Sequence, residues 1–154
     1  MVEIVFLTIS ILTFNMIAIL MPKRMTRIEI YTTSLFVLML QHLIDLIFDL
    51  KFNFYGYFSK GLDLQTLIVI FGIFPASSTI ILNYYPFYKG LKAKIFYTVL
   101  ASGACLVFEW FSLMSGYFYY TVWKLWYSAL FYPVLISVMA WNLLLIRKML
   151  KEKY

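Results

Sequence analysis

The sequence contains very few of the residues from which metal and redox centres are usually built. Among 154 residues there is a single cysteine, Cys105, and a single histidine, His42. One cysteine excludes an internal disulfide framework, a CxxC redox pair and a thiolate metal cluster. One histidine excludes HExxH hydrolases and histidine-rich di-iron centres. The sequence therefore predicts no metal site and no cofactor.

Charged residues are also scarce. Only 13% of the residues are charged and 64% are hydrophobic, whereas roughly half of an ordinary soluble domain is apolar. A chain this apolar belongs in a lipid bilayer. The net charge is +6, but the basic residues flank apolar segments, where anionic lipid and the positive-inside bias account for them. Membrane lipids are therefore the expected partners, and nucleic acid is not.

Long apolar runs are what the sequence has in abundance. Five windows can be drawn, each near the ~20 residues that a transmembrane helix needs. They cover residues 2–21, 28–48, 64–82, 95–114 and 128–146. The loops between them are too short for a second domain. The sequence predicts an all-α integral membrane bundle of five transmembrane helices, in a single domain spanning residues 1–154.

The positions of the basic residues predict the orientation of this bundle. No basic region precedes the first window and no A-x-A cleavage pattern follows it, so the first helix should stay attached. Most of the 13 Lys and Arg residues fall within residues 22–27, 89–94 and 147–153, which lie on one side of the predicted membrane. Lys51, Lys60 and Lys124 lie on the other. The positive-inside rule therefore predicts an N-terminus outside and a C-terminus in the cytoplasm.

The second window contains ionisable residues where a membrane helix should have none. These are His42, Asp45 and Asp49, which fall on one stripe of a helix, with Gln41 one turn before Asp45. A charged group within hydrocarbon costs several kcal/mol unless it faces other helices or a wet cavity. Glu109 in the fourth window is expected at a similar depth, in the outer third of the bilayer. We therefore nominate Gln41, His42, Asp45, Asp49 and Glu109 as a buried polar site for a proton or cation.

Pro75, in the third window, is a candidate hinge. Proline removes a backbone donor and bends a membrane helix, and the hydroxyl residues that follow it can satisfy the freed carbonyls. Bending without hinge motion is the simpler interpretation, since proline is common in membrane helices.

The aromatic stretch of residues 117–127 is expected outside the membrane. Its tyrosines and tryptophans are typical of an interfacial belt. A short interfacial helix that covers the polar site is the alternative.

Part of the chain resembles a known family. The residues that carry the resemblance are Met21-Pro22-Lys23-Arg24, Glu29 to Phe36, Asp45, and Asp49 to Phe58. Over residues 1–65 they look like a family of small multi-pass membrane proteins of spore-forming Firmicutes of the Bacillus and Clostridium type. That family has no assigned activity. The resemblance implies a Gram-positive plasma membrane and adds no mechanism.

Three functions remain open from the sequence. The first is a non-catalytic structural, assembly or lipid-interacting protein, whose polar residues pair with one another. The second is a proton or cation site formed by His42, Asp45 and Glu109 in a small transporter or accessory subunit, which would need a second copy of the chain or another membrane protein. The third is a membrane-embedded enzyme that uses one carboxylate as general acid or base on a lipid-like substrate.

Overall fold

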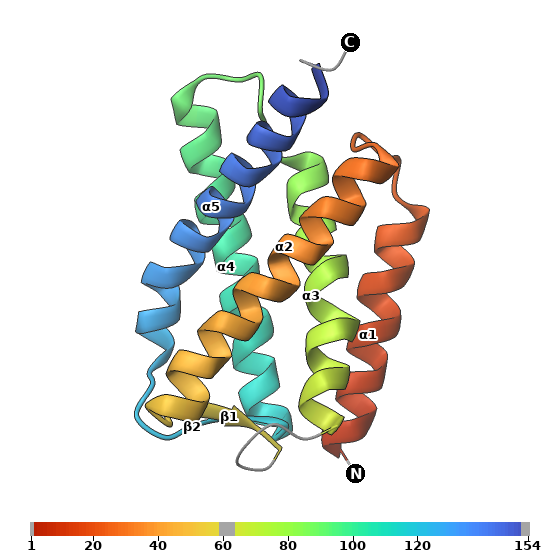
Figure 1. Ribbon diagram of the computed structural model, residues 1–154. Helices are drawn as coiled ribbons and strands as arrows, with labels where there is room; N and C mark the ends of the chain where they lie inside the picture. The colour runs from red at the N-terminus through yellow and green to blue at the C-terminus, as the bar shows by residue number, and fades with distance from the viewer. Residues whose placement is uncertain (1, 59–63, 152–154) are drawn as a thin grey trace.

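The structure is a computed structural model that describes residues 2–58 and 64–151. Five helices form most of the described chain and stand side by side in a bundle (Figure 1). They are α1 (Val2–Leu20), α2 (Arg27–Asp45), α3 (Leu64–Tyr84), α4 (Leu91–Ser115) and α5 (Leu125–Lys151). Each is long and apolar enough to cross a membrane. The prediction of a helical bundle with five helices that are able to span a membrane is confirmed. Lys60, expected on the outer side of the membrane, lies outside the described residues.

The two ends of the bundle differ in what they contain (Figure 1). One end carries the N-terminus of α1 and two short strands, and we call it the strand end, formed by residues 45–58 and 115–125. The other carries the end of α5, and we call it the C-terminal end, formed by residues 20–29, 82–92 and 146–151. The described ends of the chain therefore lie at opposite ends of the bundle.

Several helices extend beyond the apolar windows that predicted them. Thr26 caps the start of α2 in a capping box with Glu29, and α2 continues into a π-helix, η1 (Leu46–Lys51). Gly116 ends α4 with a φ of 88°, a left-handed conformation that glycine adopts without a steric penalty. The helices are longer than the predicted windows because a hydropathy window measures apolar side chains only. A helix instead continues until a cap satisfies its terminal backbone groups.

The strand end is built from two segments that are far apart in the sequence. β1 (Tyr55–Tyr57) pairs antiparallel with β2 (Phe118–Tyr120), with Gly56 opposite Tyr119. A Cβ atom at position 56 would lie 2.5 Å from the Tyr119 hydroxyl oxygen, so glycine lets that ring lie across the strand. The interfacial helix considered for residues 117–127 does not form. Aromatic residues favour extended backbone when a partner strand can pair with them.

Pro75 lies inside α3, which remains helical through it. Asn15 of α1 donates a hydrogen bond to the Gly72 carbonyl at 2.8 Å, one turn before the proline, where the ring disturbs the backbone ladder. The Thr79 hydroxyl donates to the Pro75 carbonyl at 2.7 Å. These bonds satisfy carbonyls near the proline, as expected for a proline in a membrane helix. Hinge motion at Pro75 stays a prediction.

Candidate functional site

Asp45 lies where α2 meets the strand end, and it is almost fully buried, with 3% of its surface exposed. Its Oδ1 atom accepts hydrogen bonds from Gln41 Nε2 at 2.9 Å and from the Tyr55 hydroxyl at 2.8 Å. Its Oδ2 atom is buried and has no hydrogen-bond partner in the described part of the chain. Asp45 therefore connects β1 to α2 through one oxygen and leaves the other unsatisfied.

Asp49 and His42 are the other ionisable residues nominated on this stripe. Asp49 is buried in η1, one turn beyond Asp45. His42 is half-buried, and its Nδ1 atom lies 3.1 Å from the Leu38 carbonyl oxygen, within its own helix. Its ring packs edge-on against Phe71 of α3. In the described chain His42 has no hydrogen bond to Asp45 or Glu109, so the structure does not join the three in one cluster.

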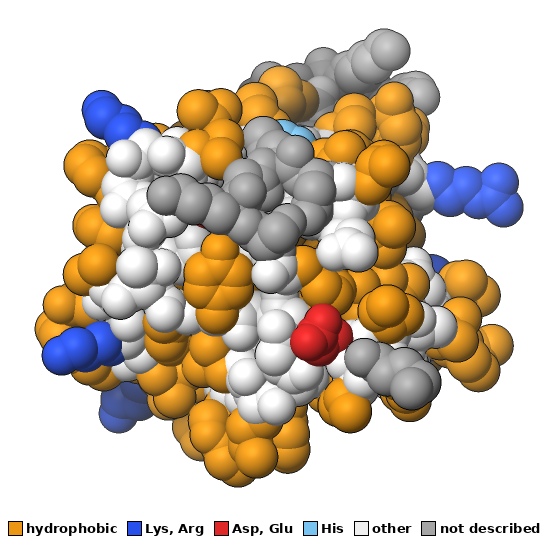
Figure 2. Space-filling model, turned by 90° about the horizontal axis from the view of Figure 1, so that it is seen from below, with side chains coloured by type: hydrophobic (Ala, Val, Ile, Leu, Met, Phe, Trp, Pro, Cys, Tyr) orange, Lys and Arg blue, Asp and Glu red, His pale blue; other side chains and the backbone are white. Residues whose placement is uncertain are grey.

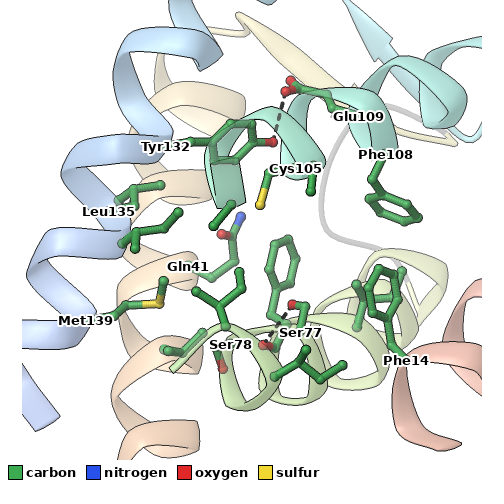
Figure 3. Close-up of a pocket in the computed structure, with 18 of the residues that line it drawn as sticks. Phe14, Gln41, Ser77, Ser78, Cys105, Phe108, Glu109, Tyr132, Leu135 and Met139 are labelled. Carbon is green, nitrogen blue, oxygen red and sulfur yellow. Dashed lines mark hydrogen bonds between the residues drawn. The ribbon is translucent and has the colours of Figure 1, made fainter. Parts of the chain in front are cut away.

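Glu109 of α4 has its own set of partners. It is buried, with 6% of its surface exposed. Its Oε1 atom accepts from the Tyr120 hydroxyl at 2.6 Å and the Ser128 hydroxyl at 2.7 Å. Its Oε2 atom accepts from the Tyr132 hydroxyl at 2.9 Å, and Figure 3 shows these two side chains pointing toward each other. Strand β2 and helix α5 thus hold this carboxyl group in place through neutral donors.

Tyrosine hydroxyls at the strand end stay protonated over the physiological range. Burial, followed by the nearby Asp45 carboxylate, raises the pKa of Tyr55 above its ordinary value. Burial, followed by the hydrogen bond to Glu109, raises the pKa of Tyr120. Burial raises the pKa of Tyr117 to about 12, with a smaller upward contribution from Glu109 and an opposing one from the Ser112 hydrogen bond. The tyrosines therefore act here as hydrogen-bond donors to carboxylates.

A cavity of about 450 Å³ lies in the middle of the bundle, within the size range of small-molecule sites. All five helices contribute to its wall, which is mostly apolar (Figure 3). Tyr57, Tyr117 and Phe118 line it at the strand end. The polar lining there includes Glu109, Ser112 and Tyr132, whereas Leu100 and Ile81 lie toward the C-terminal end. The cavity is therefore an apolar chamber, and Glu109 near the strand end is the one carboxylate among its described lining residues.

The chamber opens on the side of the bundle between α3 and α4. Helix α4 packs chiefly on α5, and α3 packs on α1 and α2. Tyr97 of α4 does donate a hydrogen bond to the Ile81 carbonyl of α3 at 2.7 Å, toward the C-terminal end. Leu100 and Ala104 line the chamber and are also exposed, Leu100 to 62%. The opening therefore lies on the apolar lateral surface, not at an end of the bundle.

The exposed face of the strand end carries little acidic surface (Figure 2). Seen from that end, the described surface is mostly hydrophobic and uncharged (Figure 2). Little acidic surface is visible there, which fits the burial of Asp45, Asp49 and Glu109. Within residues 2–58 and 64–151, no group of three or more His, Cys, Asp or Glu side chains is placed to hold a metal ion.

Sequence reasoning missed the hydroxyl partners of the two acids. Tyr132 and Ser128 lie four residues apart on α5, so they share a face, and this spacing could have identified them as partners for a buried carboxylate. Tyr120 was assigned to an interfacial aromatic belt, and Tyr55 was not nominated as a site residue. Their pairing with Asp45 and Glu109 depends on the β1–β2 register, which no local pattern specifies.

Comparison with known proteins gives no relative for this chain: no family model, no curated protein and no solved structure matches it.

Proposed function

We propose that this protein is a non-catalytic, multi-pass plasma-membrane protein that binds a lipid-like molecule inside its helical bundle. The observation that carries the proposal is the apolar chamber and its lateral opening between α3 and α4. A ligand with an apolar chain could pass from the bilayer into the chamber without crossing water. Apolar lining with a few placed polar groups is typical of small-molecule sites. Of the functions open from the sequence, lipid interaction is the one that this geometry supports best.

The proposed orientation has the strand end outside and the C-terminal end in the cytoplasm. The basic residues near residues 22–27, 89–94 and 147–153 support it through the positive-inside rule. The resemblance to spore-former membrane proteins supports a Gram-positive plasma membrane. A reporter fused after Tyr154 should be cytoplasmic, and a tag before Met1 should be accessible from outside. Finding both on one side would remove one span and overturn the orientation.

The chamber itself is tested by filling its opening. Ala104 lines the chamber and is exposed, so Ala104→Trp should place an indole in the opening. Val99 of the same helix is 61% exposed and does not line the chamber, which makes Val99→Trp the matched control. The measurement is photocrosslinking of a long-chain alcohol that carries a diazirine, with the protein in phosphatidylcholine nanodiscs. Labelling of chamber residues should fall roughly tenfold in Ala104→Trp and stay unchanged in Val99→Trp. Equal labelling of both variants would overturn the proposal.

A second candidate is a proton-binding carboxyl at Asp45. It is favoured by the Oδ2 atom, which is buried without a hydrogen-bond partner in the described chain. A buried oxygen of this kind costs less when it carries a proton than when it carries charge. Infrared spectroscopy of the protein in nanodiscs should then show a protonated carboxyl band that Asp45→Asn removes. A band unaffected by Asp45→Asn would discard this candidate.

A further inference from the structure

The polar residues that line the chamber also indicate which head group the ligand has. We propose, on the basis of the proposed lipid-binding function, that the ligand is a long-chain amine whose positively charged nitrogen binds Glu109 at the strand end of the chamber. The charge of the lining, the hydrogen bonds of Glu109 and the position of the apolar wall all favour this ligand.

The charge of the lining favours a cation. Among the described residues that line the chamber, Glu109 is the only Asp or Glu, and none is Lys, Arg or His. All the partners of Glu109 in the described chain are neutral hydroxyls, on Tyr120, Ser128 and Tyr132. A carboxylate in an apolar surrounding is stabilised strongly by a nearby positive charge. A fatty acid or a phosphate would instead bring a second negative charge into the chamber, and nothing in the lining would balance it.

The hydrogen bonds of Glu109 leave a position for one more donor. Its Oε1 atom accepts two hydrogen bonds, whereas its Oε2 atom accepts only one in the described chain. An ionised carboxylate accepts about four in total. The three hydroxyls fix the orientation of the group, so the remaining capacity on Oε2 is available to a ligand in the chamber. An ammonium group has donors and no acceptor, which suits this site.

A second acceptor lies in the same part of the lining. The Ser112 hydroxyl donates to the Phe108 carbonyl at 2.8 Å and lies 2.9 Å from the Tyr117 hydroxyl oxygen. Either hydroxyl can be the donor in the bond between Ser112 and Tyr117, and in both arrangements the Tyr117 oxygen keeps a lone pair that can accept from a ligand. Tyr117 and Ser112 both line the chamber. An ammonium group has three protons to donate, so the Tyr117 oxygen, which lines the same chamber as Glu109, is a further acceptor for it.

The position of Glu109 then places the chain of the ligand. With the nitrogen at Glu109, an alkyl chain would extend along Cys105, Ala101 and Leu100, toward the lateral opening. This wall is almost entirely apolar, so burial of the chain would provide most of the binding free energy. The carboxylate would provide selectivity between head groups, because a hydrogen bond to a charged partner is roughly twice as strong as a neutral one.

The experiment compares head groups on one chain. Dodecylamine, dodecanol and dodecanoate compete with the diazirine alcohol for the protein in phosphatidylcholine nanodiscs. The wild type should bind dodecylamine roughly tenfold more tightly than dodecanol, and dodecanoate most weakly. Glu109→Gln keeps the size of the side chain and should bind the amine and the alcohol equally. Glu3→Gln, which removes an acid at the same end that does not line the chamber, should keep the amine preference.

The outcomes separate this inference from the proposed function. If the wild type binds dodecanol as tightly as dodecylamine, and Ala104→Trp blocks both, the amine assignment is wrong and lipid binding stands. If no chain competes in the wild type, both fail. An amine preference that persists in Glu109→Gln would overturn Glu109 as the binding group. The wild-type comparison decides the question even if Glu109→Gln fails to fold.

A further arm identifies the source of the amine. Nanodiscs that contain phosphatidylethanolamine present a primary amine on a membrane lipid, next to a phosphate. Competition by this lipid against dodecylamine would assign the amine to a bilayer component. Dodecylamine binding that this lipid leaves unchanged would assign it to a free long-chain amine, as the absence of Lys and Arg from the described lining favours. Either result supports an ammonium group at Glu109.

Discussion

Glu29 and Glu109 are buried to the same extent, 6% exposed each, yet Glu29 lies in the first turn of α2, Glu109 lies near the end of α4, and the two have different partners. Glu29 Oε1 accepts from Arg147 Nε at 2.9 Å, and Oε2 accepts from the Thr26 backbone N–H at 2.8 Å. The Arg147 guanidinium also lies 4.5 Å from the centre of the Phe87 ring. Glu109 has only hydroxyl partners in the described chain and borders a chamber.

The difference separates a structural carboxylate from one that is available to a ligand. At the C-terminal end the charge of Glu29 is balanced within the protein. At the same end, Asn83 of α3 binds the segment between α1 and α2. Its side chain accepts a hydrogen bond from the Arg24 backbone N–H at 2.7 Å and donates one to the Pro22 carbonyl at 2.9 Å. At the strand end three hydroxyls orient the carboxylate of Glu109. No cation among the described residues forms an ion pair with it. We therefore expect stability to depend most on the first end and binding to depend most on the second.

The largest loss of stability is expected from Arg147→Ala. Removing the guanidinium leaves Glu29 buried without its cation, and loss of one partner of a buried pair costs about 3 kcal/mol in the free energy of unfolding. Thermal unfolding in detergent, followed by circular dichroism, measures it. Lys92→Ala, which removes an exposed cation at the same end, is the control. Equal stability of the two variants would show that the ion pair contributes nothing.

A smaller loss in the free energy of unfolding is expected from Glu109→Leu. The hydroxyls of Tyr120, Ser128 and Tyr132 would lose their acceptor, at a cost of about 2 kcal/mol. The cost stays below that of Arg147→Ala because no charge is left unpaired and water in the chamber can take up some of the hydrogen bonds. Glu109→Gln should lose less, since the amide oxygen still accepts. A Glu109→Leu variant less stable than Arg147→Ala would reverse the comparison between the two ends.

Tyr55→Phe should weaken the strand end locally. It removes one hydrogen bond to Asp45 and should cost about 1 kcal/mol. Amide hydrogen exchange should become faster in residues 54–57 and remain unchanged at the C-terminal end. Tyr119→Phe is the matched control on the paired strand, because the Tyr119 hydroxyl has no hydrogen bond among the described residues. Faster exchange at both ends of the bundle would show that the strand end does not open independently of the C-terminal end.

The smallest effect, absent at neutral pH, concerns Tyr117. Its pKa in the folded protein is about 12, above the ordinary value of 10.0, chiefly because of burial. The neutral form is therefore favoured by folding, and its contribution is complete below pH 10 and is lost as the pH rises through about 12. Unfolding measured across this range should show a loss of stability that Tyr117→Phe reduces. A variant with the same alkaline loss as the wild type would contradict this assignment.

The sequence predicted the elements of the fold better than the contacts of the site. Glu109 and Asp45 were both expected to face the interior, and both are buried. Their convergence with His42 was expected from similar depth and from the cost of leaving either carboxyl group facing lipid. The structure instead gives Asp45 and Glu109 separate hydroxyl partners, and His42 packs beside Phe71. Depth along a helix follows from a constant rise per residue, but the direction a side chain faces relative to another helix depends on how the two helices are rotated.

The number and approximate positions of the five helices and the burial of the acids followed from the sequence, because each depends on the apolar runs themselves. A run of apolar residues long enough to cross a bilayer must satisfy its own backbone hydrogen bonds, and a charge within that run must avoid lipid. The pairing of β1 with β2, the Glu29–Arg147 ion pair and the chamber were decided by the tertiary structure. Glu29 and Arg147 are 118 residues apart, and no periodicity along the chain encodes which distant side chains meet. A cavity in particular exists only where packed helices fail to fill the space between them, and that is settled by the volumes and rotations of all five helices together.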